Sequence, residues 1–252
     1  MMPQGRSGWA PADEGPHRST GDRWSEVWGF AGTDGAGTGV LTTFGVVPSA
    51  GRAWYVAALV RPGHAVAYVG DDEIGRRTDR LSVRRPGLWA DHTCEEPFEQ
   101  WTVANEAYAV ELDEPDDALG DSLGDARGTT TALAFDLEWY AAGSAEPVWP
   151  AGGAARFGYQ QRGEIDGVVE VPGGPITCSG PAHRVHLWGD LAALPDGLGP
   201  VPMPASTSAS AFATNERGVV LPVGWPLPGG VLVVEHHLTS AGWTLGPRRG
   251  AF

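Results

Sequence analysis

Apolar and polar residues alternate in short runs along much of the chain, and this period of two is typical of β-strands. In residues 131–141, four apolar side chains fall on one face of the expected strand and two acidic ones on the other: Leu133, Phe135, Leu137 and Trp139 against Asp136 and Glu138. Similar runs, rich in β-branched and aromatic residues, lie between Gly, Pro and Asp residues. They predict strands over residues 37–48, 52–62, 64–70, 80–85, 100–113, 129–141, 155–172 and 229–239.

Strands at regular spacing with few helical signals predict an all-β barrel or sandwich. The acidic segment 115–128 is expected to be an exposed loop with a helical turn. The Gly- and Ala-rich segment 141–158 is the expected junction between two parts of the chain, and the Pro- and Ser-rich segment 194–212 is the expected surface loop. With 252 residues, the chain is long enough for one large all-β domain or for two barrels.

The run GLWADHTCEEPFEQWTVANEAYAVELDE, residues 87–114, concentrates candidate chemistry. Pro97 cannot donate a ladder hydrogen bond, so it predicts a break or bulge at a barrel rim. Carboxylates beside Trp89 and Trp101 would be partly desolvated, with the raised pKa that a general acid needs. The candidate acids are Glu95, Glu96 and Glu99. The alternative is that they are rim carboxylates paired with Arg84, Arg85 or a backbone amide.

The charge of the chain limits which classes of binding partner are expected. The chain has 31 acidic and 17 basic residues, a net charge of −14 and no lysine. This balance argues against nucleic acid and anionic membranes as partners, and the lack of lysine excludes Schiff-base and P-loop chemistry. The N-terminus has no apolar core of a secretory signal, and no run approaches the ~18 apolar residues of a membrane span. We therefore expect a soluble, cytoplasmic protein, monomeric or homodimeric, with a disordered tail over residues 1–17.

The histidines and cysteines predict no metal and no cofactor. On a strand, His183 and His186 fall on opposite faces, and Cys94 and Cys178 have no C-x-x-C partner. Two buried thiols are expected rather than a disulfide, although a single disulfide stays open. His186, near Trp188 and Asp190, is the preferred acid–base candidate of the second half, and a buried structural histidine is the equal alternative.

Other templates do not fit. GTDGAGTG precedes a strand rather than a helix, which argues against a phosphate cradle, and Ser179 and Ser240 lack the G-x-S-x-G context of a hydrolase. The chain has eleven tryptophans, more than a core of this size needs. Several are expected to line an apolar ligand cavity, with core packing as the default for each one singly.

The order of several motifs resembles the carotenoid hydratase-like and AttH-like proteins, a tandem lipocalin-like (calycin) family that includes cyclases of secondary metabolism. The resemblance covers roughly residues 17–192 and rests on HRSTGDRWSEVWGF, AWYVAALVRPG, the 87–114 run, AFDLEWY and GEIDGVVEV followed by CSGPAHRVHLWGD. Many relatives carry aspartate and serine where this chain has Val185 and Leu187. That aspartate is a natural proton donor, so its replacement puts the relatives' chemistry in doubt here.

The resemblance implies an all-β fold of two tandem lipocalin-like antiparallel barrels, at residues 18–148 and 155–252, the second shortened or remodelled. It implies a cofactor-free cyclase, isomerase or hydratase that acts on a hydrophobic polyketide or isoprenoid in bacterial secondary metabolism. The alternative is a non-catalytic carrier of an apolar ligand. The expected catalytic residues are Glu95, Glu96, Glu99, His186 and Asp190, and the expected ligand-binding residues are Trp28, Trp54, Trp89, Asp91, Trp101, Glu138 and Trp188.

Overall fold

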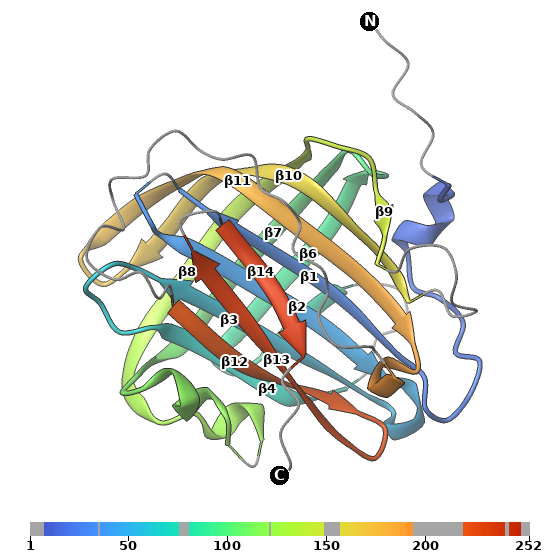
Figure 1. Ribbon diagram of the computed structural model, residues 1–252. Coiled ribbons are helices and arrows are strands. Elements are labelled where there is room, and N and C mark those ends of the chain that lie inside the picture. Colours follow the sequence, from blue (N-terminus) through green and yellow to red (C-terminus); the bar gives the residue numbers. More distant parts are fainter. Residues whose placement is uncertain are drawn as a thin grey trace, which may run out of the picture.

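The computed structural model describes residues 8–34, 36–75, 81–120, 122–148, 157–193, 219–239 and 242–247. These residues form two antiparallel sheets and short 3-10 helices (Figure 1). The strands are β1 (Ser25–Thr33), β2 (Gly39–Val47), β3 (Arg52–Val60), β4 (Ala67–Gly75), β5 (Leu81–Arg85), β6 (Leu88–Glu96), β7 (Gln100–Leu112), β8 (Gly128–Ala141), β9 (Glu146–Pro147), β10 (Gly158–Val171), β11 (Gly174–Gly189), β12 (Val219–Leu227), β13 (Gly230–Thr239) and β14 (Gly242–Pro247). The 3-10 helices are η1 (Pro11–Glu14), η2 (Pro48–Ala50), η3 (Pro115–Ala118), η4 (Leu123–Asp125) and η5 (Leu191–Ala193).

The large sheet closes on itself. Its strand order is β4-β3-β2-β1-β11-β10-β8-β7-β6-β5, with β9 paired to β10. The second half of β7 also pairs with β4, through Ala67 opposite Glu111 and Tyr68 opposite Val110. This pairing completes a ring that runs β1, β2, β3, β4, β7, β8, β10, β11 and back to β1, a barrel from which β6 and β5 extend.

The barrel interior is filled by apolar side chains. The four apolar residues predicted to share a face of β8 are at most 4% exposed and belong to this core, so that alternation is confirmed. Trp28 and Phe30 of β1, Phe44 of β2 and Trp101 of β7 pack into it from neighbouring strands. Such close packing leaves the middle of the barrel occupied by protein.

The small sheet β12-β13-β14 lies against the outer face of the barrel wall (Figure 1). A second apolar cluster fills the space between them and contains Val27, Leu41, Trp54, Val185 and Leu187 from the barrel. Trp225 of β12 contributes the opposing ring, 6.0 Å from that of Trp54. Strands β1, β2, β3 and residues 182–187 of β11 are therefore covered on both faces, which explains why these residues are almost all buried.

The tandem barrels are not confirmed. The expected junction at residues 141–158 separates strands that pair in one sheet, because β10 and β11 lie between β8 and β1. The remaining described strands of the expected second barrel form the small sheet. Residues 149–156 of the junction and the expected loop 194–212 lie outside the described residues.

The local predictions agree with the structure better than the predicted tandem barrels do. Each predicted strand overlaps an observed one, and η3 and η4 supply the helical turn expected in residues 115–128. Strand β6 ends immediately before Pro97, and the register with β7 shifts between Cys94 and Glu96, as expected of a bulge at a rim. Cys94 and Cys178 are free thiols. No helix in the described part of the chain has the length and apolarity needed to cross a membrane.

Candidate functional site

The N-terminal segment closes one end of the barrel. Residues 1–17 are predicted to be a disordered tail, but from residue 8 onward the segment is placed against the barrel, with helix η1 at its centre. Trp9 contacts the rings of Tyr159 and Trp188, at 5.2 and 5.7 Å between centroids. The tail expectation is therefore wrong for residues 8–17, because their anchors lie far away in the sequence.

Glu14 at the end of η1 is the main anchor. Its carboxylate accepts hydrogen bonds from both terminal nitrogens of Arg184, at 2.5 and 2.7 Å, and the two side chains are 3% and 1% exposed. Arg184 also donates to the side-chain oxygen of Gln161 from Nε and Nη2. The backbone N–H of Phe98, at the tip of the β6–β7 hairpin, donates to Glu14 as well. A buried charge pair with this many hydrogen bonds is well satisfied.

Aromatic rings surround the Arg184 guanidinium. The rings of Phe98, Trp101, Trp139 and Tyr159 have centroids 4.9–5.8 Å from its central carbon. Phe98 reaches this position with a φ of 63°, which turns its amide toward Glu14 and its carbonyl toward Gln161. The run 87–114 therefore supplies two of the aromatic rings around the guanidinium, those of Phe98 and Trp101.

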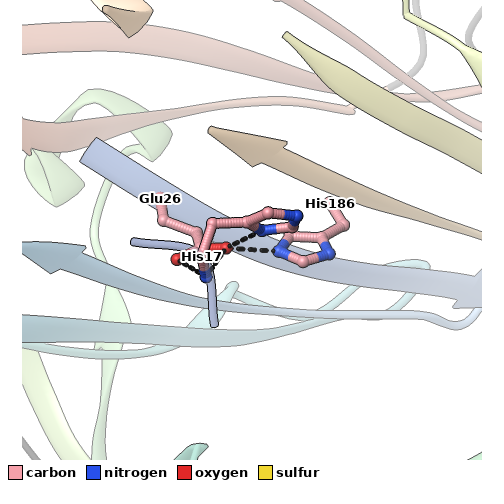
Figure 2. A group of neighbouring side chains, drawn as sticks. All are labelled: His17, Glu26 and His186. Atoms are coloured by element: carbon pink, nitrogen blue, oxygen red, sulfur yellow. Dashed lines mark hydrogen bonds and ion pairs between the residues drawn. The ribbon is translucent and has the colours of Figure 1, made fainter. Parts of the chain in front are cut away.

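Next to this ion pair lies a second polar group, formed by His17, Glu26 and His186 (Figure 2). Both imidazoles point at the same oxygen of Glu26: His17 Nδ1 lies 2.7 Å from Oε1, and His186 Nε2 lies 2.8 Å from it. The backbone N–H of His17 also donates to both carboxylate oxygens, at 3.0 and 3.1 Å. Glu26 and His186 are 1% and 0% exposed, whereas His17 is 21% exposed.

The sheet register brings two of these residues together. In the pairing of β1 with β11, Glu26 lies opposite Trp188 and Trp28 lies opposite His186, so all four side chains share the inner face. Trp28 stacks on His186 at 4.5 Å, and Trp188 stacks on His17 at 3.8 Å. The second ring nitrogen of His186 lies 3.3 Å from the Tyr159 hydroxyl. We call this group of His17, Glu26 and His186 the His–Glu–His cluster.

Burial and charge act differently on the two histidines. Burial lowers the pKa of His17, but hydrogen bonds and the negative charges of Glu26 and Asp13 outweigh it, so this pKa is raised above its ordinary value. Burial also lowers the pKa of His186, and there it outweighs the favourable effect of Glu26. The cluster thus favours a protonated His17 beside a neutral His186.

The cluster also consists of metal-ligating residue types. One ligand atom from each of the three side chains lies within 4.8 Å of the other two. The expectation of no metal rested on short sequence spacings, and these residues are separated by nine and by 160 positions. His17 and Glu26 were not among the predicted site residues, although His17 lies in the HRSTGD motif of the family resemblance.

Four predicted residues meet at this end of the barrel: His186, Trp28, Trp101 and Trp188. The expected opposite faces of His183 and His186 are confirmed, because Arg184 and His186 face inward while Val185 and Leu187 pack toward the small sheet. An aspartate at position 185 would therefore point away from His186. The replacement by Val185 removes nothing from the His–Glu–His cluster.

The predicted acids lie elsewhere. Glu95, Glu96 and Glu99 are exposed, so the expected partial burial is not found; the bulge turns their side chains to solvent. Glu95 accepts a hydrogen bond from Thr102. Asp190 forms an exposed ion pair with Arg23, 3.0 Å apart. Any catalytic role of these residues stays a prediction.

The other predicted ligand-binding residues are dispersed. Trp54 is buried between the barrel and the small sheet, and Glu138 accepts hydrogen bonds from Gln100 and Thr102. Asp91 is partly exposed on β6, on the same face as Trp89. Trp89 lines an open groove of about 590 Å³ together with Tyr108.

Sequence reasoning missed Glu14, Tyr159, Gln161 and Arg184. Arg184 was within a quoted motif, since it begins the arginine-x-histidine-x-tryptophan-glycine run at 184–189. Arg184 and His186 are two residues apart, so on a strand they share a face, and an arginine that is buried there requires a buried acid. No residue near Arg184 in the sequence indicates which acid that is.

Comparisons with known proteins give a family but no activity. No curated protein matches the chain. A crystal structure of an AttH candidate from Nitrosomonas europaea is 13% identical, with a TM-score of 0.42 over 97% of this chain and 73% of that one. A likeness of this degree supports no conclusion about function. The sequence profile of a family described as "Domain of unknown function (DUF7064)" matches residues 10–234, nearly the whole chain, and the protein therefore belongs to this family.

Proposed function

We propose that the protein is an enzyme that transfers a proton to or from a hydrophobic small molecule at the barrel end closed by the N-terminal segment. The observation that carries this proposal is the His–Glu–His cluster, a buried carboxylate held between two imidazoles and walled by aromatic rings. Cyclisation, isomerisation and hydration of a polyketide or isoprenoid, as in bacterial secondary metabolism, all need such a proton transfer.

His17 is the member of the cluster that a substrate can reach. Its side chain is 21% exposed, whereas those of Glu26 and His186 are enclosed. The raised pKa of His17 favours its protonated form, which is the form that a general acid needs. Glu26 stabilises the imidazolium, and His186 donates from Nε2 to the same carboxylate oxygen and so fixes its position.

The surface around His17 suits an apolar substrate. Three partly exposed rings form a row here: Trp9 packs edge-on against Trp188, and Trp188 stacks on His17. A flat or unsaturated hydrocarbon group can pack against these indoles while the imidazolium reaches one of its atoms. A cation that develops after protonation would be stabilised by the same rings.

The filled barrel interior favours this proposal over a carrier. A carrier must enclose its ligand in an apolar cavity. Here the interior is occupied by Phe30, Trp101, Trp139 and their neighbours. Chemistry at the end of the barrel does not require that space.

The test compares substitutions in the cluster with substitutions of the exposed rim acids. The full-length protein is incubated with a panel of isoprenoids and polyketides, and hydrated or isomerised products are detected by mass spectrometry and chromatography. For a compound that is converted, we expect His17→Asn and Glu26→Gln to reduce turnover about 10²-fold or more, the scale of general acid catalysis. Glu95→Gln and Glu99→Gln are the matched controls and should retain the rate. If the rim variants lose turnover while folded cluster variants keep it, the reaction belongs to the rim.

A further inference from the structure

We propose that the His–Glu–His cluster is a binding site for a divalent transition-metal ion, with His17 Nδ1, His186 Nε2 and a carboxylate oxygen of Glu26 as ligands. The proposal goes beyond the proton-transfer function and does not rest on it, because it follows from the arrangement of the three ligand atoms. An imidazole binds a metal only through a deprotonated nitrogen, so the metal-bound state and the state with a protonated His17 exclude each other. Glu26 Oε1 lies 2.7 Å from one imidazole nitrogen and 2.8 Å from the other.

The distances fit a small cation. Nitrogen and oxygen ligands bind zinc and similar ions at about 2.0–2.2 Å, which places neighbouring ligand atoms about 2.8–3.1 Å apart in octahedral geometry and about 3.3–3.6 Å apart in tetrahedral geometry. The two contacts to Glu26, at 2.7 and 2.8 Å, lie at the short end of the octahedral range and below the tetrahedral one. A metal ion would therefore require these two contacts to lengthen slightly, with the two imidazole nitrogens, which lie within 4.8 Å of each other, adjusting around it.

The donor set selects the class of ion. Two imidazoles and one carboxylate are a common set for zinc and for non-haem iron(II), and the three protein ligands leave coordination positions for water or a substrate. Calcium and magnesium prefer all-oxygen sites, so they fit this set poorly. We expect zinc, cobalt(II), iron(II) or manganese(II) to bind, with the affinity rising from manganese(II) through iron(II) to cobalt(II).

The surroundings resemble the outer sphere of a metal centre. In such centres, the ring nitrogen that does not bind the metal donates to an oxygen, which fixes the orientation of the imidazole. The Tyr159 hydroxyl lies 3.3 Å from His186 Nδ1, and the Asp13 carboxylate lies 3.6 Å from His17 Nε2. Both imidazoles thus have an oxygen on the side that faces away from Glu26. The carboxylate itself is held by the backbone N–H of His17.

The ligands come from parts of different rigidity. Glu26 and His186 lie on the paired strands β1 and β11 and are both enclosed, so the sheet holds these two ligands ready. His17 lies in the N-terminal segment, between η1 and β1. A metal ion that joins all three would tie this segment to the barrel wall, so metal binding should also protect the segment from proteolysis.

Titration of the chelator-treated, full-length protein with zinc and cobalt(II) tests the proposal. We expect one ion per chain by calorimetry and elemental analysis, and absorption bands of cobalt(II) typical of nitrogen and oxygen ligands. His17→Asn alters a partly exposed side chain and should fold; it should weaken binding at least about 100-fold, as should Glu26→Gln. His64→Asn is the matched control, because His64 is exposed and remote in sequence, and should bind as the wild type does.

Two results would overturn the metal site: no saturable binding of either ion to the wild-type protein, or binding that His17→Asn and Glu26→Gln leave intact. Limited proteolysis adds an independent reading, since metal should slow cleavage within residues 8–24 of the wild type but not of His17→Asn. If metal does not bind while the cluster variants still lose turnover, proton transfer by the imidazole alone remains. If metal binds and no panel compound is converted, the metal site stands without the proposed reaction.

Discussion

Replacing Glu14 with glutamine should destabilise the protein far more than the loss of a surface charge. The carboxylate lies 2.5 and 2.7 Å from two Arg184 nitrogens, and both side chains are almost completely enclosed. In the variant, the guanidinium stays among aromatic rings with only neutral acceptors: the oxygens of Gln161 and Tyr159 and the amide oxygen that replaces the carboxylate. A buried cation would then lack its counter-charge.

Breaking a buried ion pair by removing one partner costs about 3–5 kcal/mol. The lower end is expected here, because the N-terminal segment can detach and let water reach Arg184. For the same reason, the cost cannot exceed the free energy that holds this segment on the barrel. The double variant Glu14→Gln, Arg184→Met removes both charges and places a flexible apolar side chain among the rings. It should be more stable than Glu14→Gln alone.

Urea unfolding, followed by tryptophan fluorescence and circular dichroism, measures these differences. The control is Asp190→Asn, which breaks the exposed ion pair between Asp190 and Arg23 and should cost at most about 1 kcal/mol. The reasoning would be refuted by a Glu14→Gln variant no less stable than Asp190→Asn. A double variant less stable than Glu14→Gln would likewise show that the uncompensated charge is not the cause.

Three further outcomes follow from the structure. Burial lowers the pKa of His92 to about 3, so the unfolded chain takes up the proton first as the pH falls. Through this histidine the wild type should lose about 2 kcal/mol of stability between about pH 7.5 and pH 5, and His92→Gln should not show this loss. An unchanged pH dependence of the free energy of unfolding in urea titrations would contradict this. A side chain on Gly45 would collide with the Trp54 indole, so Gly45→Ala should lower the free energy of unfolding by about 1–3 kcal/mol, whereas Gly75→Ala, with open space around it, should not. Trp225 is fully buried against the barrel wall, so Trp225→Ala should cost about 3–5 kcal/mol; a smaller loss in thermal or urea unfolding would mean that the small sheet contributes little to stability.

The sequence by itself determined the local structure. Alternation of apolar and polar residues located the strands and assigned their faces, because successive side chains of a strand point in opposite directions wherever that strand is placed. Pro97 predicted the end of β6 and the bulge beside it for an equally local reason, since proline has no N–H to donate. The same alternation placed His183 and His186 on opposite faces. It also places Arg184, two residues before His186, on the same face as His186.

Only the tertiary structure decided which strands pair and which polar side chains meet. The pairing of β4 with β7 closes the barrel, and the pairing of β1 with β11 brings Glu26 beside His186. A period of two is the same for any partner strand, so it carries no information on pairing across the chain. Glu14 and His17 resemble parts of a polar tail in the sequence because the partner of Glu14, Arg184, is 170 residues away. The partner of His17, Glu26, lies nine residues further on, inside β1. The candidate site therefore arises from the closure of the sheet and from the N-terminal segment that covers its end.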